Sequence, residues 1–207
     1  MSKTEHPLQA LSKYLPPNTF VEVAAYLQQH KVHLTVARER KSILGDYRNA
    51  YNNSNHRISV NGNLNTWSFL VTLLHELAHL LTFEKYGNKV QAHGREWKTI
   101  FGQLLARFIQ KKVFPADIEK ELLATLHNPA ASSCAEESLM RVLRKYDKKN
   151  DGHRLVEEIP ANALFRMKDG RVFKKGEKLR KRYRCEEIAT KKAYLFSPVF
   201  EVELLTV

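Results

Sequence analysis

The spacing of apolar residues changes twice within the first sixty positions of the chain. Residues 7–30 carry apolar side chains at helical spacing on both sides of a double proline, which predicts two helical segments. Residues 32–37 alternate between apolar and mostly polar side chains, which predicts a strand. Two further short strands are predicted at 45–48 and 56–60, joined by an asparagine-rich turn, because asparagine tolerates positive φ.

A longer helical pattern follows these strands. It runs from about Thr66 to Tyr86, and Gly87 suits the C-cap of a helix ending there. Two more helices are predicted, at about 95–111 and 115–126. A small group of strands followed by a run of helices predicts an α+β fold for this part of the chain.

The pattern of apolar residues again predicts strands near the end of the sequence, where short apolar runs are separated by turn residues. Between the two regions lies a polar stretch with loop signals and one short helical pattern. The sequence therefore predicts a domain at 1–126, a connector at 127–154 and a small β-rich module at 155–207.

Composition narrows the class of protein. With 43% hydrophobic and 27% charged residues among 207, the chain can bury a core and does not have the composition of a disordered or fibrous protein. The most apolar stretch, 69–83, is too short to span a bilayer, and the first residues lack the apolar run of a secretory signal. We therefore expect a cytoplasmic protein without a membrane partner. Cys134 and Cys185 are too few for a disulfide framework or a four-cysteine zinc site.

The motif that carries chemistry is His75-Glu76-Leu77-Ala78-His79. On a helix, positions i and i+4 lie on one face, so both imidazoles can reach one metal ion. About 0.03 such matches are expected by chance at this composition. The leucines around the motif imply burial, and buried ionisable groups need a partner or a metal. The competing interpretation is a pair of satisfied core histidines beside a surface glutamate.

A catalytic zinc ion has about three protein ligands and keeps one position for water. Glu76 lies beside the two histidines, where it can take a proton from that water. For the third ligand we favour His93, which lies fourteen residues after His79 and next to Gly94. The rival ligands are Glu84, which a straight helix points elsewhere, and Glu96.

The segment HELAHLL, followed after a short loop by HGREW, resembles the SprT-like family, which includes bacterial SprT and Spartan-type zinc metalloproteases. The resemblance extends over roughly residues 1–125. It implies a zincin-like metallopeptidase domain in which His75, His79 and His93 bind one Zn²⁺ and Glu76 is the general base. It also implies a DNA-associated protease with a role in DNA repair. Bacterial relatives often end in a zinc ribbon with two cysteine pairs. That cysteine pattern is missing here, so we expect a ribbon-like module without metal.

Positive charge is concentrated in the second half of the chain. Residues 144–192 contain 17 lysines and arginines against 8 aspartates and glutamates, and so supply nine of the twelve net positive charges. Such clusters neutralise phosphates, whereas the competing interpretation is a solvated strand face. The neighbouring aromatics, Phe173 and Tyr183, either stack on bases or lie in the core. The candidate nucleic-acid contacts are Lys174, Lys175, Lys178, Arg180, Lys181, Arg182 and Arg184.

These observations predict a zinc metalloendopeptidase of the HExxH type that hydrolyses protein substrates, with DNA as a partner. Two alternatives remain at this stage. One is a nucleic-acid-binding protein whose zinc site is structural or vestigial. The other is an interaction module whose histidines are only core residues.

Overall fold

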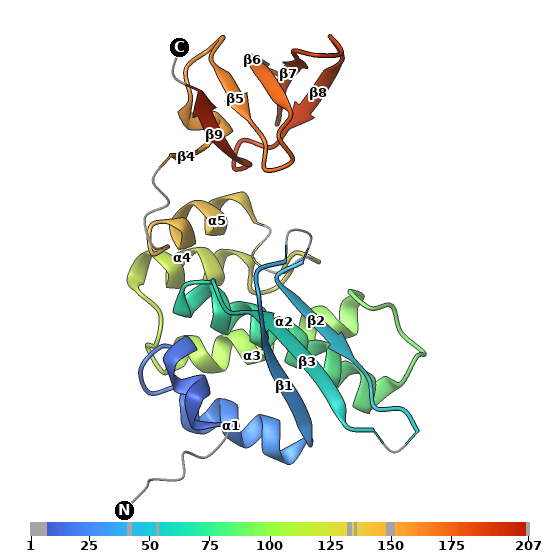
Figure 1. Ribbon diagram of the computed structural model, residues 1–207. Helices are drawn as coiled ribbons and strands as arrows, with labels where there is room; N and C mark the ends of the chain where they lie inside the picture. Colours follow the sequence, from blue (N-terminus) through green and yellow to red (C-terminus); the bar gives the residue numbers. More distant parts are fainter. Residues whose placement is uncertain are drawn as a thin grey trace, which may run out of the picture. The chain divides into compact units, whose positions relative to one another are not determined.

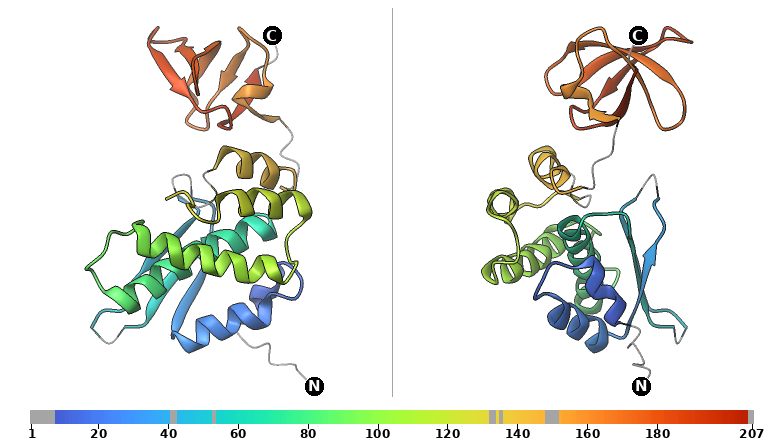
Figure 2. Two further views of the ribbon diagram at one scale, coloured as in Figure 1. Left: turned by 180° about the vertical axis from the view of Figure 1, so that it is seen from behind. Right: turned by 60° about the vertical axis from the view of Figure 1, so that its left-hand side comes forward.

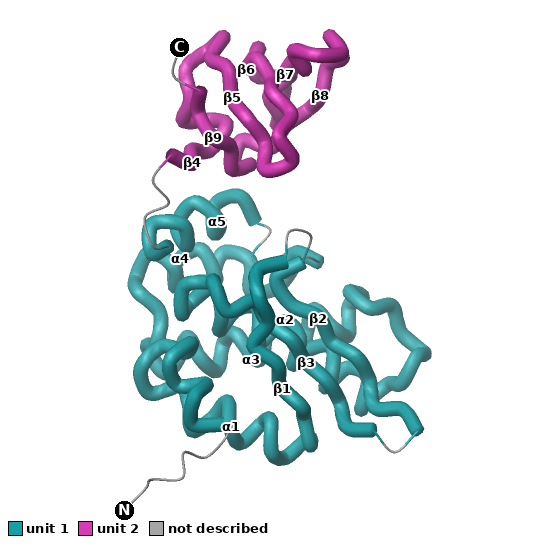
Figure 3. The backbone as a smooth tube through the Cα atoms, in the orientation of Figure 1, with its two compact units in different colours: residues 1–147 teal, residues 148–207 magenta. Residues whose placement is uncertain are grey.

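The chain divides into two compact units, residues 1–147 and 148–207 (Figure 3). The computed structural model describes residues 8–40, 43–52, 54–131, 134, 136–147 and 152–205. The predicted connector, 127–154, contains a helix that packs against the preceding helix within unit 1. The first unit therefore continues to residue 147.

Unit 1 combines a small sheet with helices, as the sequence pattern predicts (Figure 1). The long central helix and the three predicted strands occur where the periodicity places them. Its elements in chain order are η1 (Gln9–Tyr14), α1 (Phe20–Gln29), β1 (Val32–Ala37), β2 (Gly45–Arg48), β3 (His56–Asn61), α2 (Thr66–Tyr86), α3 (Arg95–Gln110), α4 (Ala116–Thr125) and α5 (Glu137–Arg144).

The three strands form a sheet in the order β1-β3-β2. β1 pairs parallel with β3, and β2 pairs antiparallel with β3 in a register that sets Gly45 opposite Val60. β2 is therefore an edge strand, and both β2 and β3 contact α2. Because side chains alternate across a strand, every second residue of β2 faces this helix.

Helix α2 forms the centre of the unit. The Asn65 side chain accepts a hydrogen bond from Ser68 N–H (2.8 Å) and so caps its first turn. Gly87 ends it with a φ of 61° and donates its N–H to Phe83 O (2.7 Å). Thirteen of the 21 residues in α2 are buried, so this helix lies in the core rather than on it. None of the helices in the described part of the chain is both long and apolar enough to cross a membrane.

Unit 2 is β-rich, and it has a core of its own built from Phe165, Phe173, Cys185, Phe196 and neighbouring apolar residues. Its single sheet has the order β4-β9-β5-β6-β7-β8, each strand antiparallel to its neighbours, and it is strongly curved in Figure 2. The elements are β4 (His153–Leu155), η2 (Val156–Glu158), β5 (Leu164–Arg166), β6 (Val172–Lys178), β7 (Tyr183–Glu187), β8 (Ala193–Phe196) and β9 (Glu201–Leu205).

Candidate metal centre

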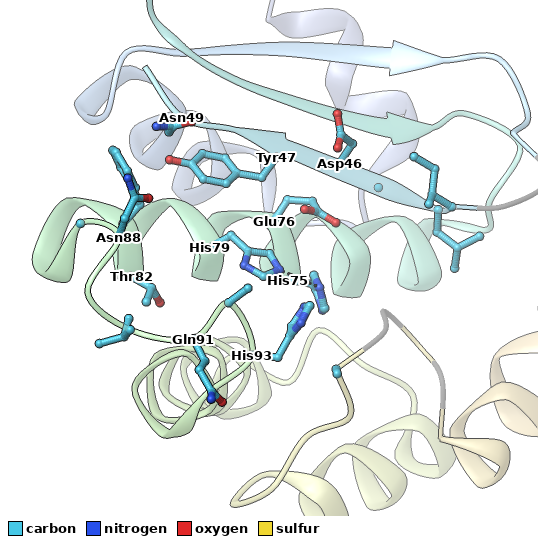
Figure 4. Close-up of a pocket in the computed structure, with 18 residues that line it drawn as sticks. Asp46, Tyr47, Asn49, His75, Glu76, His79, Thr82, Asn88, Gln91 and His93 are labelled. Atoms are coloured by element: carbon cyan, nitrogen blue, oxygen red, sulfur yellow. Dashed lines mark hydrogen bonds between the residues drawn. The ribbon is translucent and has the colours of Figure 1, made fainter. Parts of the chain in front are cut away.

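Three histidines converge in unit 1 (Figure 4). His75 and His79 come from successive turns of α2, and His93 comes from the loop that leads into α3. Their potential ligand atoms all lie within 4.8 Å of one another. Among the residues that the structure describes, no other three histidine, cysteine, aspartate or glutamate side chains are grouped this closely.

The geometry of these rings fits a tetrahedral ion. Two nitrogen ligands at 2.0–2.1 Å from such an ion lie about 3.3 Å apart. The Nε2 atoms of His75 and His79 are 3.2 Å apart. His93 Nε2 is buried and forms no hydrogen bond within the described residues, although buried polar atoms normally have a partner. A metal ion would supply that partner.

Burial keeps the three imidazoles neutral. It lowers the pKa of His75 to about 3, with smaller contributions from His79 and His93. Burial, followed by the neighbouring His93, lowers the pKa of His79 to about 4. The pKa of His93 is also lowered, by burial and then by Lys98. Neutral imidazole is the form that binds metal, so the site presents its ligands ready for coordination.

Trp97, the last residue of the HGREW segment, holds the three rings together. Its indole lies 4.7 Å from the His75 ring, 5.2 Å from His79 and 4.8 Å from His93, measured between centroids. It is completely buried, and Phe101 packs behind it at 5.0 Å. The tryptophan therefore fixes the loop histidine against the helical pair.

Glu76 lies beside the histidines and is 4% exposed. The pKa of its carboxyl group is raised to about 8, first by burial and then by Asp46, while Arg40 opposes the shift. A carboxyl group whose pKa lies near the operating pH can both accept and return a proton. Glu76 and the three histidines line one pocket of about 690 Å³, together with residues of β2.

Tyr47 on β2 also lines this pocket, a position that the sequence pattern alone does not predict. Its ring is nearly parallel to that of His79, with centroids 6.4 Å apart. His56 Nδ1 lies 2.9 Å from Tyr47 Oη and accepts the Ala50 N–H (3.2 Å). A backbone N–H can only donate, so Nδ1 is an acceptor and the Tyr47 hydroxyl donates to it.

The two rival ligands lie outside the histidine group. Glu84 Oε2 is 2.8 Å from His30 Nδ1, and its Oε1 is 3.8 Å from His56 Nε2. This carboxylate on α2 therefore links the C-cap residue of α1 and the first residue of β3. Glu96 is in the first turn of α3, where a carboxylate is favourable for the helix dipole.

In unit 2, one of the seven candidate nucleic-acid contacts must be corrected. Lys175 is 5% exposed and donates from Nζ to Ile159 O (2.6 Å) and Glu157 O (3.4 Å). Its ammonium group is therefore engaged inside the module. The other six basic residues are exposed, namely Lys174, Lys178, Arg180, Lys181, Arg182 and Arg184.

Of the two candidate aromatic residues in unit 2, Phe173 lies in the core and Tyr183 is half-buried against it. Phe173 is fully buried, and the ammonium groups of Lys175 and Lys178 lie 4.4 and 5.7 Å from the Tyr183 ring centroid. These rings serve packing and cation–π contacts.

Comparison with known protein families gives a match over the part of the chain that contains the site. Residues 17–119 match the model of the SprT-like family, a segment that includes β1 to β3, α2, α3 and the whole histidine group. No curated protein and no solved structure matches the chain.

Proposed function

Because residues 17–119 belong to the SprT-like family, we propose that the chain is a zinc-dependent metalloendopeptidase. The observation that carries the proposal is the convergence of three neutral imidazoles beside a buried carboxyl group in one pocket. The ligands would be His75, His79 and His93, with Glu76 as general base. A structural zinc site would have no use for that buried carboxyl group, which leaves a vestigial centre as the principal alternative.

In peptide hydrolysis, the histidines would hold the zinc ion and Glu76 would transfer the proton. A bound zinc ion supplies Lewis-acid polarisation of a carbonyl group and lowers the pKa of water. Glu76 would accept the proton of the attacking water on a carboxylate oxygen. The same carboxyl group would then return that proton to the nitrogen of the leaving amine. Burial raises the pKa of this carboxyl group in the metal-free protein, and a bound zinc ion would lower it toward the deprotonated form that accepts the proton.

Strand β2 offers a place for an extended peptide. It is the edge of its sheet and lines the pocket together with the histidines. Edge strands bind extended segments through backbone hydrogen bonds, which require no particular side chain. We therefore expect an unfolded or locally extended segment of a protein as the substrate.

Glu76→Gln tests the proposal. Zinc-loaded wild-type protein should cleave an unfolded basic protein, and the variant should lose about 10²–10⁴-fold in rate while it retains zinc. His33→Gln, at an exposed position of β1, is the matched control and should cleave at the wild-type rate. Absence of cleavage by fully zinc-loaded wild type would favour a vestigial centre in a nucleic-acid-binding protein.

We further propose that the tip of the β6–β7 hairpin contacts nucleic acid, so that the substrates are DNA-associated or DNA-crosslinked proteins. Residues 178–184 contain five basic and no acidic residues. Leu179 N–H donates to Arg182 O (2.8 Å) and closes the turn, on which all five basic side chains are exposed. Exposed cations at a hairpin tip can neutralise successive phosphates.

The hairpin is tested by replacing Arg180, Lys181 and Arg182 together with alanine. DNA affinity should fall, and the salt slope should decrease by about 2–3 if each side chain neutralises one phosphate. The matched control removes the same charge from Arg166, Arg171 and Lys191, which form ion pairs with Glu203, Asp169 and Glu186. Equal loss of affinity in both variants would mean that net charge, and not the hairpin, determines binding.

A further inference from the structure

The inner face of β2 presents only two residues to α2. Gly45 and Tyr47 lie two positions apart and so point to the same side of the sheet. In Figure 4, Tyr47 and Glu76 lie between β2 and α2, whereas Asp46 points to the other side of the strand. Gly45 lies next to Glu76, the proposed general base, and the ring of Tyr47 packs beside that of His79.

Gly45 is required by space and not by backbone conformation. It is not among the glycines with positive φ, so its backbone would accept any residue. A Cβ atom added there would lie 2.5 Å from Glu76 Oε1, 2.9 Å from Glu76 Cγ and 2.8 Å from Thr72 Cγ2. Cβ contacts below 3.0 Å essentially never occur, so either the strand or both the glutamate and the Thr72 methyl group would have to move.

The strand is the less able of the two to move. Asn61 N–H donates to Leu44 O (2.9 Å), next to Gly45, and the Asn61 amide donates to Ile43 O (3.0 Å). Arg40 in turn donates to Asn61 Oδ1 (2.8 Å). Asn61 is 1% exposed, so these bonds fix the entry to β2 from inside the protein. A side chain at position 45 would therefore displace the carboxyl group.

The backbone at Gly45 has a second property. The bond from Asn61 N–H to Leu44 O makes the next pair, Gly45 and Val60, one whose backbone groups point away from each other. The N–H and C=O of Gly45 are thus directed to the edge of the sheet. A peptide lying along that edge would pass directly beside Glu76.

We propose that Gly45 is the positioning residue for the general base. Because Gly45 has no side chain, the edge strand can approach the Glu76 carboxyl group closely. This approach keeps the carboxyl group beside the position that a peptide bound along β2 would occupy. This inference rests on the proposed peptidase function. Ordinary contact begins at 3.4 Å, so Gly45→Ala would displace the carboxyl oxygen by about 0.9 Å. A misplacement of that size lowers a rate by about 100-fold.

The first experiment measures peptide hydrolysis and zinc content for Gly45→Ala. We expect kcat to fall between about 10- and 100-fold. KM and zinc stoichiometry should stay near the wild-type values, since the three histidines are untouched. Gly102→Ala is the matched control, because its Cβ would lie 2.5 Å from Leu126 O, a residue outside the pocket. It should lower the thermal midpoint and leave kcat unchanged.

A second measurement does not depend on activity. Gly45→Ala should lower the thermal midpoint of the metal-free protein, and most of that loss should disappear in a Glu76→Ala/Thr72→Ser background, where neither the carboxyl group nor the threonine methyl group occupies the space. The comparison also serves if Gly45→Ala alone fails to fold. A wild-type kcat in Gly45→Ala, or an equal loss of midpoint in both backgrounds, would overturn the inference. If zinc-loaded wild type cleaves no peptide, the proposed function itself fails, while the stability comparison still tests the contact.

Discussion

The two helical histidines should make the metal-free protein sensitive to mild acid, because they are buried without charge. His75 and His79 have pKa values of about 3 and 4 in the folded protein, against 6.5 for an exposed histidine. Below pH 6.5 the unfolded chain therefore binds protons that the folded protein does not accept. The stability that these two neutral groups contribute is complete well above pH 6.5 and falls with pH until their folded-state pKa values are reached.

The size of the loss follows from the same values. Between pH 7 and pH 5, each histidine removes about 2 kcal/mol of unfolding free energy, at 1.36 kcal/mol per pKa unit. Together they remove roughly 3–4 kcal/mol of the 5–15 kcal/mol typical of a domain. Glu76 acts in the opposite direction, because its folded-state pKa of about 8 lies above the ordinary value of 4.5, and it returns about 2–2.5 kcal/mol over the same interval. With a denaturation slope of about 2 kcal/mol/M, the wild-type urea midpoint should fall by roughly 0.5–1 M, and the two histidines should account for a difference of roughly 1.5–2 M.

Urea unfolding in the presence of a chelator provides the assay. Both tryptophans, Trp67 and Trp97, lie in unit 1, so their fluorescence reports the unit that contains the site. The double variant His75→Gln/His79→Gln should lose much less stability between pH 7 and pH 5 than the wild type. His33→Gln, at an exposed position, should show the wild-type loss. An equal loss in the double variant and the wild type would refute the assignment of acid sensitivity to the buried pair.

Three further outcomes are expected. Cys134 and Cys185 should not react with a thiol reagent at pH 8 until the protein is denatured, because both thiols are buried. Burial raises the pKa of Cys134 to about 12, and it also raises the pKa of Cys185. Prompt labelling of two thiols in native protein would contradict this. Tyr47→Phe removes the donor to His56 Nδ1 and should lower unfolding free energy by about 1 kcal/mol in a denaturation experiment, with zinc content unchanged. Lys175→Met leaves a buried carbonyl oxygen without its donor and should lower the stability of unit 2 by about 1–3 kcal/mol, without effect on peptide hydrolysis.

Periodicity was sufficient to place the elements around the site. Helix α2 begins at Thr66 and ends at Tyr86 as predicted, because its apolar run is long and Gly87 provides an unambiguous end. The three strands of unit 1 lie within a residue of the predicted bounds. His93 lies against the helical pair, where a loop of that length beside Gly94 can bring it.

The pairing of the strands could not be predicted in the same way. The local sequence does not determine that β1 pairs with β3 and that β2 is the edge strand, since the strand order depends on packing against α2. For this reason the contacts of Gly45 and Tyr47 with the site were missed. The burial of Lys175 did leave a signal, because it stands two residues after Phe173 and so shares its face of the strand.

The position of α2 at the centre of the core has a consequence for how a metal ion would enter and leave. Amide protons in a helix this buried should exchange with solvent mainly through unfolding of the whole unit, so we expect the backbone that holds His75 and His79 not to open locally. His93 is anchored differently, on a loop outside the regular helices. If the site binds metal as proposed, release of an ion would begin with the loop histidine, while the helical pair keeps its spacing. Metal exchange would then depend on one loop, and the empty site would remain preformed for the next ion.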